Sequence, residues 1–181
     1  RDYGAGTLLN AQDKRMNSLP QTLDEIADLA SPVTTLARAV PLDWTDYNGH
    51  MNEARYLQAF GDATDKMMAL VGCDMDYIAT GGSFFTAETH IRHIDEVRAG
   101  TRIQIRTQVL AGAGKKMHLF HWMYDGVRLL ATGEHMLIHV SLKSRKAAEP
   151  DARVAAPLAR IAQAHAGLPW PDGAGRAVGR K

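Results

Sequence analysis

The fold is decided by the stretch Trp44-Thr45-Asp46-Tyr47-Asn48-Gly49-His50-Met51-Asn52-Glu53-Ala54-Arg55-Tyr56-Leu57. It joins a polar, turn-forming segment to the longest segment of helical periodicity in the chain. From Ala54 to Val71, apolar residues recur three and four positions apart and form one face of an amphipathic helix. Asn52 is a suitable N-cap, and the helix start beyond it presents unpaired N–H groups and a partial positive charge. The stretch therefore predicts one long helix whose N-terminus can hold a carboxylate or a polarised carbonyl.

Composition limits the class of protein. With 181 residues, 45% of them hydrophobic, the chain can fill one core but not two. A formal charge of +1 gives no electrostatic case for nucleic-acid binding. No apolar run is long enough to span a membrane, and the single Cys73 excludes an intrachain disulfide, so we expect a cytoplasmic protein. Because the first residue is Arg1, we also expect a piece of a longer polypeptide.

The order of the elements predicts an α+β domain. Residues 1–32 read as a linker or lead-in with a short helix near Leu23–Leu29, and residues 33–145 as the folded domain. A first strand over 33–42 precedes the long helix, a glycine-containing loop follows the helix, and four strands come next, over 83–94, 101–111, 115–124 and 127–142. Asp125-Gly126 is a strong hairpin signal, so these strands should form an antiparallel meander that buries the helix. Residues 146–181 should form a short surface helix over 151–166 and an irregular tail.

Asp46, Asn48 and His50 bring an acid, an amide and an imidazole next to the helix start. This set suits attack on an activated carbonyl, with the carboxylate as base or nucleophile and the helix N–H groups stabilising the oxyanion. The same residues also have an ordinary turn composition, in which the aspartate caps its own backbone. The residues alone leave both interpretations open.

The eight histidines do not predict a metal site. His118 and His121 point to opposite faces of a strand, as do His90 and His93, because side chains alternate along a strand. His135 and His139 share a face, but the spacing places no third ligand beside them. Cys73 has no activating partner nearby in the sequence, so it is best interpreted as a small hydrophobic residue.

The segment from Asp46 to Leu57 resembles the signature of hot-dog-fold acyl-CoA thioesterases of the 4-hydroxybenzoyl-CoA thioesterase type. The resemblance covers about residues 34–142 and includes Val97–Thr101 and Ala131–Glu134. It implies an antiparallel sheet wrapped around one long central helix, with two subunits paired edge to edge and active sites at their interface. It also implies hydrolysis of a thioester to a free acid and coenzyme A, with no metal or other cofactor.

By this resemblance Asp46 is the catalytic carboxylate, which attacks the carbonyl or activates water. Asn48 and His50 would position the reacting groups, and backbone N–H groups around Asn52 and Glu53 would polarise the carbonyl oxygen. Related sequences commonly carry asparagine where this chain has Glu53. The departure leaves open whether Glu53 is a second carboxylate of the site or a solvated acid in the first helical turn.

The two ends of the chain resemble thioesterase domains fused behind a carnitine dehydrogenase, a class associated with betainyl-CoA hydrolysis. A trimethylammonium group is usually held by aromatic faces and an acid. The counter-charge would come from Glu88 or Glu134, and Phe84 and Tyr124 are further aromatic candidates beside the preferred set. The residues preferred for substrate binding are Trp44, Tyr47, Tyr56, Phe85 and Trp122.

The sequence therefore predicts hydrolysis of a short polar acyl-CoA, preferably betainyl-CoA, by a homodimer or larger homo-oligomer joined to a dehydrogenase domain. It predicts neither a nucleic-acid nor a membrane partner. Two alternatives keep the same fold. One is a hot-dog dehydratase, and the other is a non-catalytic acyl-CoA-binding or assembly module of a fused dehydrogenase.

Overall fold

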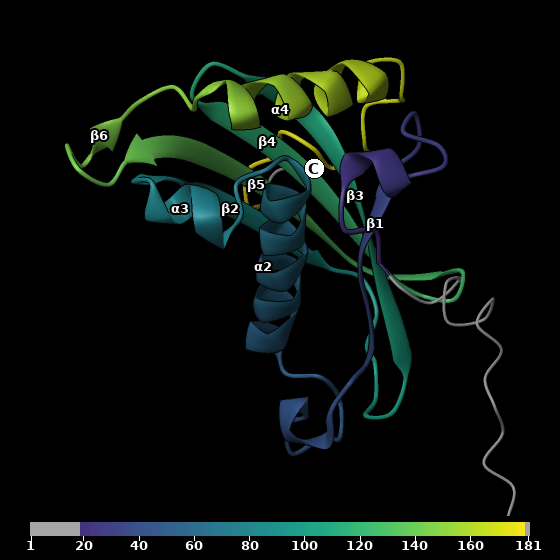
Figure 1. The fold of residues 1–181 in the computed structure, drawn as a ribbon. Helices are drawn as coiled ribbons and strands as arrows, with labels where there is room; N and C mark the ends of the chain where they lie inside the picture. The colour runs from purple at the N-terminus through teal and green to yellow at the C-terminus, as the bar shows by residue number, and fades with distance from the viewer. Residues whose placement is uncertain (1–18, 180–181) are drawn as a thin grey trace, which may run out of the picture.

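The computed structural model describes residues 19–179, which form a curved antiparallel sheet around one long helix (Figure 1). The strand order is β1-β3-β4-β5-β2, and a short strand β6 pairs with the end of β5. Each predicted strand is present, with ends within a few residues of the predicted ones. The bounds are β1 Val33–Ala39, β2 Gly82–His93, β3 Arg102–Ala113, β4 Lys116–Asp125, β5 Arg128–Ser141 and β6 Lys146–Ala147.

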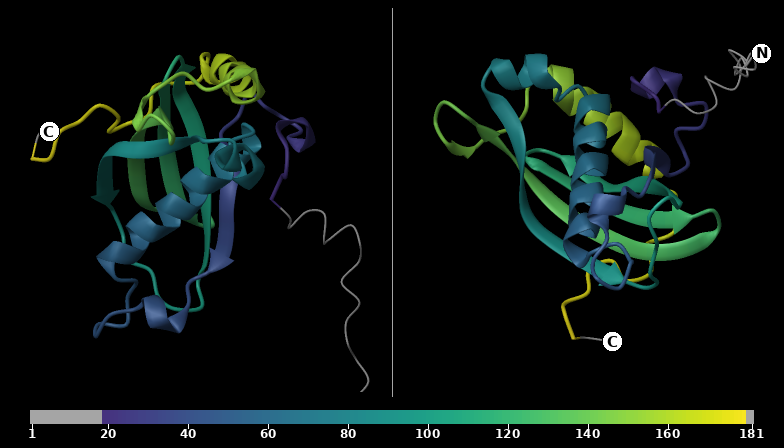
Figure 2. Two further views of the ribbon diagram at one scale, coloured as in Figure 1. Left: turned by 60° about the vertical axis from the view of Figure 1, so that its left-hand side comes forward. Right: turned by 90° about the horizontal axis from the view of Figure 1, so that it is seen from below.

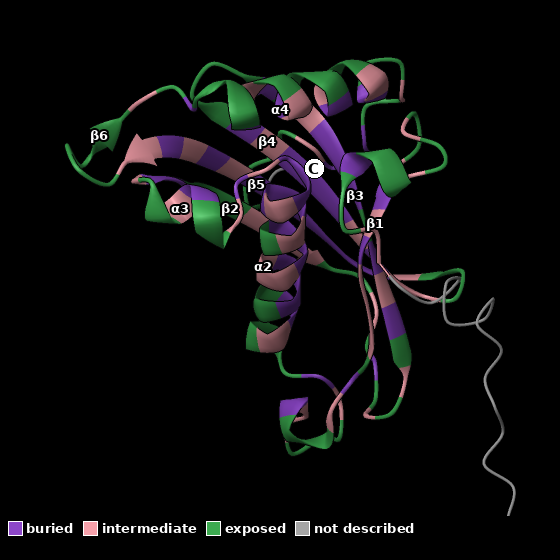
Figure 3. Cartoon of the chain, viewed as in Figure 1, coloured by how far each residue is buried: buried purple, intermediate pink, exposed green. Residues whose placement is uncertain are grey.

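Helix α2 (Glu53–Leu70) is the predicted central helix, and the sheet curls around it (Figure 2). The buried side of α2 faces the strands (Figure 3). Phe60 and Met67 of this helix are completely buried. Gly133 of β5 lets this helix approach closely, because a Cβ atom there would lie 2.9 Å from the Phe60 ring. Neither α2 nor any other helix between residues 19 and 179 is long and apolar enough to cross a membrane.

Helix α4 (Ala152–His165) was predicted as a surface helix, but it also closes one end of the core. Val154, Leu158 and Ile161 are buried in the same cluster as Met67 of α2. A Cβ atom at Gly112 of β3 would lie 2.7 Å from Leu158, so the glycine permits this packing. The prediction missed this role because the spacing of apolar residues in α4 gives its buried face but not the partner of that face.

Smaller elements also differ from the prediction. The strand predicted over 33–42 ends at Ala39, and Leu42–Trp44 forms a 3-10 turn, η2. The predicted loop after α2 contains a short helix, α3 (Met75–Ala79), whose N-cap is Asp74. In residues 19–32 of the lead-in, the structure has the 3-10 turn η1 (Leu23–Glu25) in place of the predicted short helix, and the first 18 residues lie outside the described part of the chain. Cys73 is buried, and burial raises the pKa of its thiol, in agreement with the predicted hydrophobic role.

The C-terminal tail after α4 is irregular, as predicted. It contacts Glu134, which points away from α2 because the next residue of β5, His135, packs against Phe60 of that helix. We call this face of the sheet the outer face. The N–H of Gly175 donates to Glu134 at 2.8 Å, and Asp172 pairs with Arg92 at 3.2 Å. The Trp170 ring lies 6.3 Å from the ring of His118. These contacts attach the tail to β2, β4 and β5.

Candidate active site

The turn before α2 is held by its own aspartate. Asp46 Oδ1 accepts a hydrogen bond from the Asn48 N–H at 2.8 Å, and the Asp46 N–H donates to the His50 carbonyl at 2.9 Å. Gly49 has a φ of +76°, a conformation that favours glycine. Asp46 Oδ2 makes no hydrogen bond within residues 19–179, so the ordinary turn role and a chemical role for Asp46 are compatible.

The start of α2 leaves one of the two predicted oxyanion donors free. The Asn52 side chain accepts from the Ala54 N–H at 3.0 Å, which confirms Asn52 as the N-cap. The Asn52 N–H donates to the Trp44 carbonyl at 2.9 Å and is therefore occupied. Among the described residues the Glu53 N–H has no acceptor, so it is the donor that remains for a bound carbonyl oxygen.

A shallow cleft lies in front of this helix start, and we call it the Asp46 cleft. It brings together three residues singled out from the sequence, Asp46, Glu53 and Tyr56. The other wall comes from the end of β2 and the segment after it, which the sequence motifs did not indicate. The lining residues are Asp46, Met51, Glu53, Tyr56, His93, Ile94, Asp95 and Glu96.

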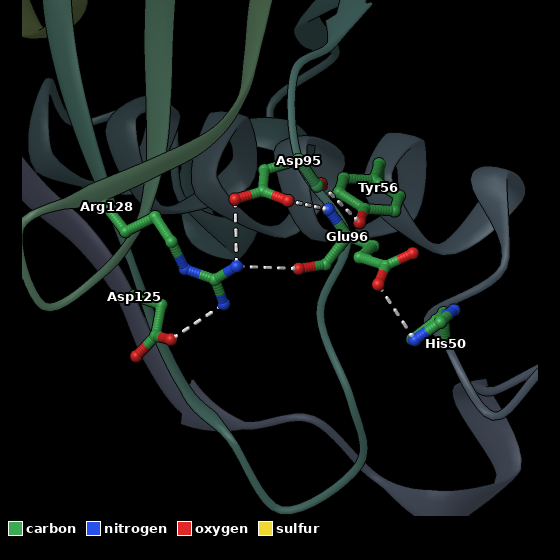
Figure 4. A network of polar contacts seen from close by, with 6 residues as sticks. All are labelled: His50, Tyr56, Asp95, Glu96, Asp125 and Arg128. Carbon is green, nitrogen blue, oxygen red and sulfur yellow. Dashed lines mark hydrogen bonds and ion pairs between the residues drawn. The ribbon is translucent and has the colours of Figure 1, made fainter.

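A polar network fixes the wall after β2 (Figure 4). Arg128 of β5 pairs with Asp95 at 2.8 Å and with Asp125 at 3.0 Å. The Glu96 N–H and the Arg128 guanidinium lower the pKa of Asp95. The Tyr56 hydroxyl donates to the Asp95 carbonyl at 3.3 Å, and burial, followed by the charge of Asp95, raises the Tyr56 pKa. Tyr56 therefore stays protonated and acts as a hydrogen-bond donor to this wall.

His50 connects the turn to the same wall. Its Nε2 lies 3.2 Å from Glu96 Oε1, and its backbone forms an isolated bridge with Arg98. The next N–H, of Met51, donates to the Val97 carbonyl at 2.7 Å. The two sequence segments that carried the family resemblance, around Asp46 and around Val97, thus lie side by side and hold one another.

Two of the predicted substrate-binding aromatic residues lie beside the cleft rather than in it. Trp44 is 4% exposed and packs under the Arg38 guanidinium, which lies 4.3 Å from its ring. It lines a separate hollow with Arg55, on the other side of the helix cap. Tyr47 lies in the turn and is 97% exposed.

Phe85 and Trp122 do not line the Asp46 cleft in this chain. Phe85 lies near the start of β2 and lines a hollow with Leu142 and Arg145. Trp122 lies on the outer face, with its ring 4.8 Å from that of Phe120.

The predicted counter-charges are also elsewhere. Glu88 and Glu134 line a hollow on the outer face, where Glu134 pairs with His118 at 2.7 Å. Alternation along the strands explains this placement, because the neighbours of Trp122 and Glu134 face α2. Within one chain, Phe85, Trp122, Glu88 and Glu134 therefore lie outside the Asp46 cleft, and their predicted role in holding a trimethylammonium group stays a prediction.

Comparison with known proteins identifies the family. Residues 40–158 match the family model described as the thioesterase-like superfamily. The chain belongs to this superfamily. We therefore interpret the geometry of the Asp46 cleft in terms of thioester hydrolysis.

Two relatives show how the chain corresponds to longer and shorter proteins. It is 57% identical over 180 residues to the L-carnitine dehydrogenase/betainyl-CoA thioesterase of Ruegeria pomeroyi, covering 98% of this chain and 37% of the relative. It is 40% identical over 154 residues to the betainyl-CoA thioesterase of Pseudomonas aeruginosa, covering 83% of this chain and 97% of that protein. This thioesterase-like chain thus spans little more than a third of the first relative and nearly all of the second.

Solved structures support the hot-dog fold. A candidate thioesterase from Pseudomonas putida KT2440 superposes with a TM-score of 0.72 at 32% identity, covering 83% of this chain and 97% of that one. A Staphylococcus aureus protein solved in complex with CoA superposes with a TM-score of 0.77 at 19% identity, covering 83% of this chain and 98% of that one. The predicted α+β hot-dog architecture, with its sheet around one helix, is confirmed.

Proposed function

We propose that this chain hydrolyses betainyl-CoA to the free acid and coenzyme A, with Asp46 as the catalytic carboxylate. The observation that carries the proposal is that Asp46 and Glu53 line one open cleft, each with a group, Asp46 Oδ2 and the Glu53 N–H, that has no hydrogen-bond partner among residues 19–179. The choice of substrate rests on the names of the relatives from Ruegeria pomeroyi and Pseudomonas aeruginosa.

In the proposed mechanism the thioester carbonyl binds between Asp46 and the start of α2. Asp46 either attacks the carbonyl carbon or takes a proton from the attacking water, and the carbonyl oxygen accepts a hydrogen bond from the Glu53 N–H. The positive end of the helix stabilises the negative charge that develops on this oxygen. The carbon–sulfur bond then breaks. If Asp46 acts as a base, the proton that it took from water passes to the sulfur, and coenzyme A and the free acid leave directly. If Asp46 attacks the carbonyl, the coenzyme A thiolate leaves and takes a proton from solvent, and water then hydrolyses the acyl-Asp46 anhydride to the free acid and restores the carboxylate. The Asn48 N–H keeps the turn in place by donating to Asp46, and His50 does so through its contact with Glu96.

We also propose that the active unit is a homodimer or a larger homo-oligomer. Strand β2 is an edge of the sheet within residues 19–179, and five successive residues of it, 85–89, are exposed. Natural proteins rarely leave so long an edge without a cover, because its free N–H and C=O groups invite pairing with another strand. A second copy paired along β2 would cover this edge. The 37% coverage of the Ruegeria relative supports the further proposal that a dehydrogenase domain adjoins the chain.

The test is release of free thiol from betainyl-CoA, acetyl-CoA and 4-hydroxybenzoyl-CoA by the purified protein. Asp46→Asn should lower kcat by about 100-fold or more, the typical effect of losing an acid–base group. The asparagine oxygen can still accept from the Asn48 N–H, so the turn should survive.

Asp43→Asn is the matched control, because Asp43 is exposed and lies outside the Asp46 cleft. Wild-type turnover by Asp46→Asn would refute the catalytic assignment. Binding of acyl-CoA in calorimetry without thiol release from any substrate would favour the non-catalytic module.

A further inference from the structure

The Asp46 cleft contains more negative than positive charge. Four carboxylates, those of Asp46, Glu53, Asp95 and Glu96, line it, and among residues 19–179 no lysine or arginine does so. Such a cleft attracts cations and disfavours anionic groups, because like charges brought together in a cleft are costly. The charge therefore bears on which acyl groups the cleft accepts.

The four carboxylates differ in how far their charge is compensated. Asp95 is paired with Arg128 at 2.8 Å. Glu53 stands in the first turn of α2, where the positive end of the helix offsets part of its charge. In the proposed mechanism Asp46 is the nucleophile or the base of the reaction itself. Glu96 has neither an arginine partner nor a helix end among the described residues, and its only ion-pair partner there is His50, at 3.2 Å.

The structure also directs the Glu96 carboxylate into a defined place. Its backbone N–H is held by Asp95 Oδ1 at 2.8 Å, and its carbonyl oxygen accepts from Arg128 at 3.3 Å. Figure 4 shows the Glu96 side chain extending toward His50, whereas Asp95 turns toward Arg128. Glu96 thus reaches His50 of the Asp46 turn and lines the same cleft as Glu53 at the start of α2.

We infer that Glu96 is a specificity-determining residue that selects acyl-CoA thioesters whose acyl group carries a positive charge close to the thioester carbonyl. The inference rests on the proposed function, in which the carbonyl lies between Asp46 and the Glu53 N–H. In a trimethylammonioacetyl group the nitrogen is one methylene from the carbonyl, so the cation must lie within the cleft. Tyr56 and His93, whose rings are 4.8 Å apart, supply an aromatic wall for its methyl groups.

The experiment compares two substrates of the same shape. Betainyl-CoA and 3,3-dimethylbutanoyl-CoA differ only in the quaternary centre, which is a charged nitrogen in the first and a neutral carbon in the second. The quantity measured is the ratio of kcat/KM for the charged substrate to kcat/KM for the neutral one. Both substrates use the same catalytic groups. A substitution that merely displaces the Asp46 turn therefore lowers kcat/KM for both substrates equally and leaves the ratio unchanged.

Glu96→Gln should lower the ratio by about fivefold, the effect of removing one solvent-exposed ion pair. Glu149→Gln, an identical change at an exposed position outside the cleft, should leave it unchanged. An unchanged ratio in Glu96→Gln, with thiol still released from betainyl-CoA, would overturn the role of Glu96 and leave the proposed function intact. Absence of thiol release from both substrates by the wild-type protein would overturn both proposals.

Discussion

At the scale of the residue, Gly133 sets how closely the central helix approaches the sheet. It belongs to the Ala131–Glu134 segment that supported the family resemblance, and the structure gives the physical reason for a glycine there. The Phe60 ring of α2 occupies the space where a side chain would begin, at 2.9–3.1 Å. Contacts this short force either the ring or the strand to move.

We expect Gly133→Ala to lower the free energy of unfolding by about 1–3 kcal/mol, the usual cost of overpacking a core. Gly61→Ala is the matched control, because outside the backbone of its own helix no heavy atom of residues 19–179 lies within 4 Å of the added Cβ at that position in α2. There the alanine should raise the free energy of unfolding by about 0.5–1 kcal/mol through helix propensity. Urea denaturation of the three proteins measures both effects, and equal changes in the two variants would contradict the close approach.

At the scale of the element, α2 and the sheet enclose two histidines that neither the turn motif nor the cleft uses. His121 Nδ1 lies 2.8 Å from the Thr107 hydroxyl, and its Nε2 lies 3.1 Å from the Thr64 hydroxyl. His135 packs beside it, with the two rings 5.0 Å apart. Burial lowers the pKa of both, well below the ordinary value for His121 and to about 4 for His135.

These two histidines should make stability depend on pH. In the unfolded chain His135 takes up a proton near pH 6.5, whereas in the folded protein it does so only near pH 4. The unfolded state therefore binds more protons between these values, and the free energy of unfolding falls as the pH is lowered through this window. The loss from His135 alone should reach about 3 kcal/mol at pH 4.

His135→Leu should remove this contribution and flatten the dependence of unfolding free energy on pH between 7 and 4. The leucine also eliminates His135 Nε2, a buried atom without a partner in the described part of the chain, so the variant should fold. Denaturation at a series of pH values, with circular dichroism as the probe, gives the slope. A slope equal to that of the wild type would show that His135 does not contribute.

At the scale of the whole molecule, the exposed edge of β2 bears on assembly and activity together. One edge of this strand is paired with β5, and Phe85 of the strand is 55% exposed. Phe85 and Trp122 remain predicted substrate-binding residues that lie outside the Asp46 cleft of their own chain. In the proposed dimer, paired along β2, we expect residues of one protomer to complete the cleft of the other.

Ala87→Lys should break the proposed dimer, because the register places Ala87 in the bulge of β2, where two copies would bring the new charges together. We expect sedimentation to shift from dimer to monomer and thiol release to fall in parallel. Val127→Lys introduces the same charge at the tip of the β4–β5 hairpin, where the side chain is 99% exposed, and should change neither. A wild-type sedimentation profile in Ala87→Lys would argue against pairing along this edge.

The sequence by itself determined the features that depend on near neighbours. The spacing of apolar residues gave α2, the alternation in 101–111 gave β3, and Asp125-Gly126 gave the β4–β5 hairpin, because each pattern reflects local backbone geometry. The N-cap role of Asn52 was predicted for the same reason. The turn at Asp46 was predicted too, although the sequence did not decide between a capping role and a catalytic role for this residue.

Only the tertiary structure decided what faces Asp46. Asp95 and Glu96 line the cleft because β2 pairs with β5, whose Arg128 holds the segment that carries them. Trp122 and Glu134 are kept from the cleft by the alternation of side chains across the sheet. Helix α4 joined the core because its buried face meets the end of α2. Such contacts join residues far apart in the chain, and they depend on strand register and sheet curvature, which local patterns do not specify.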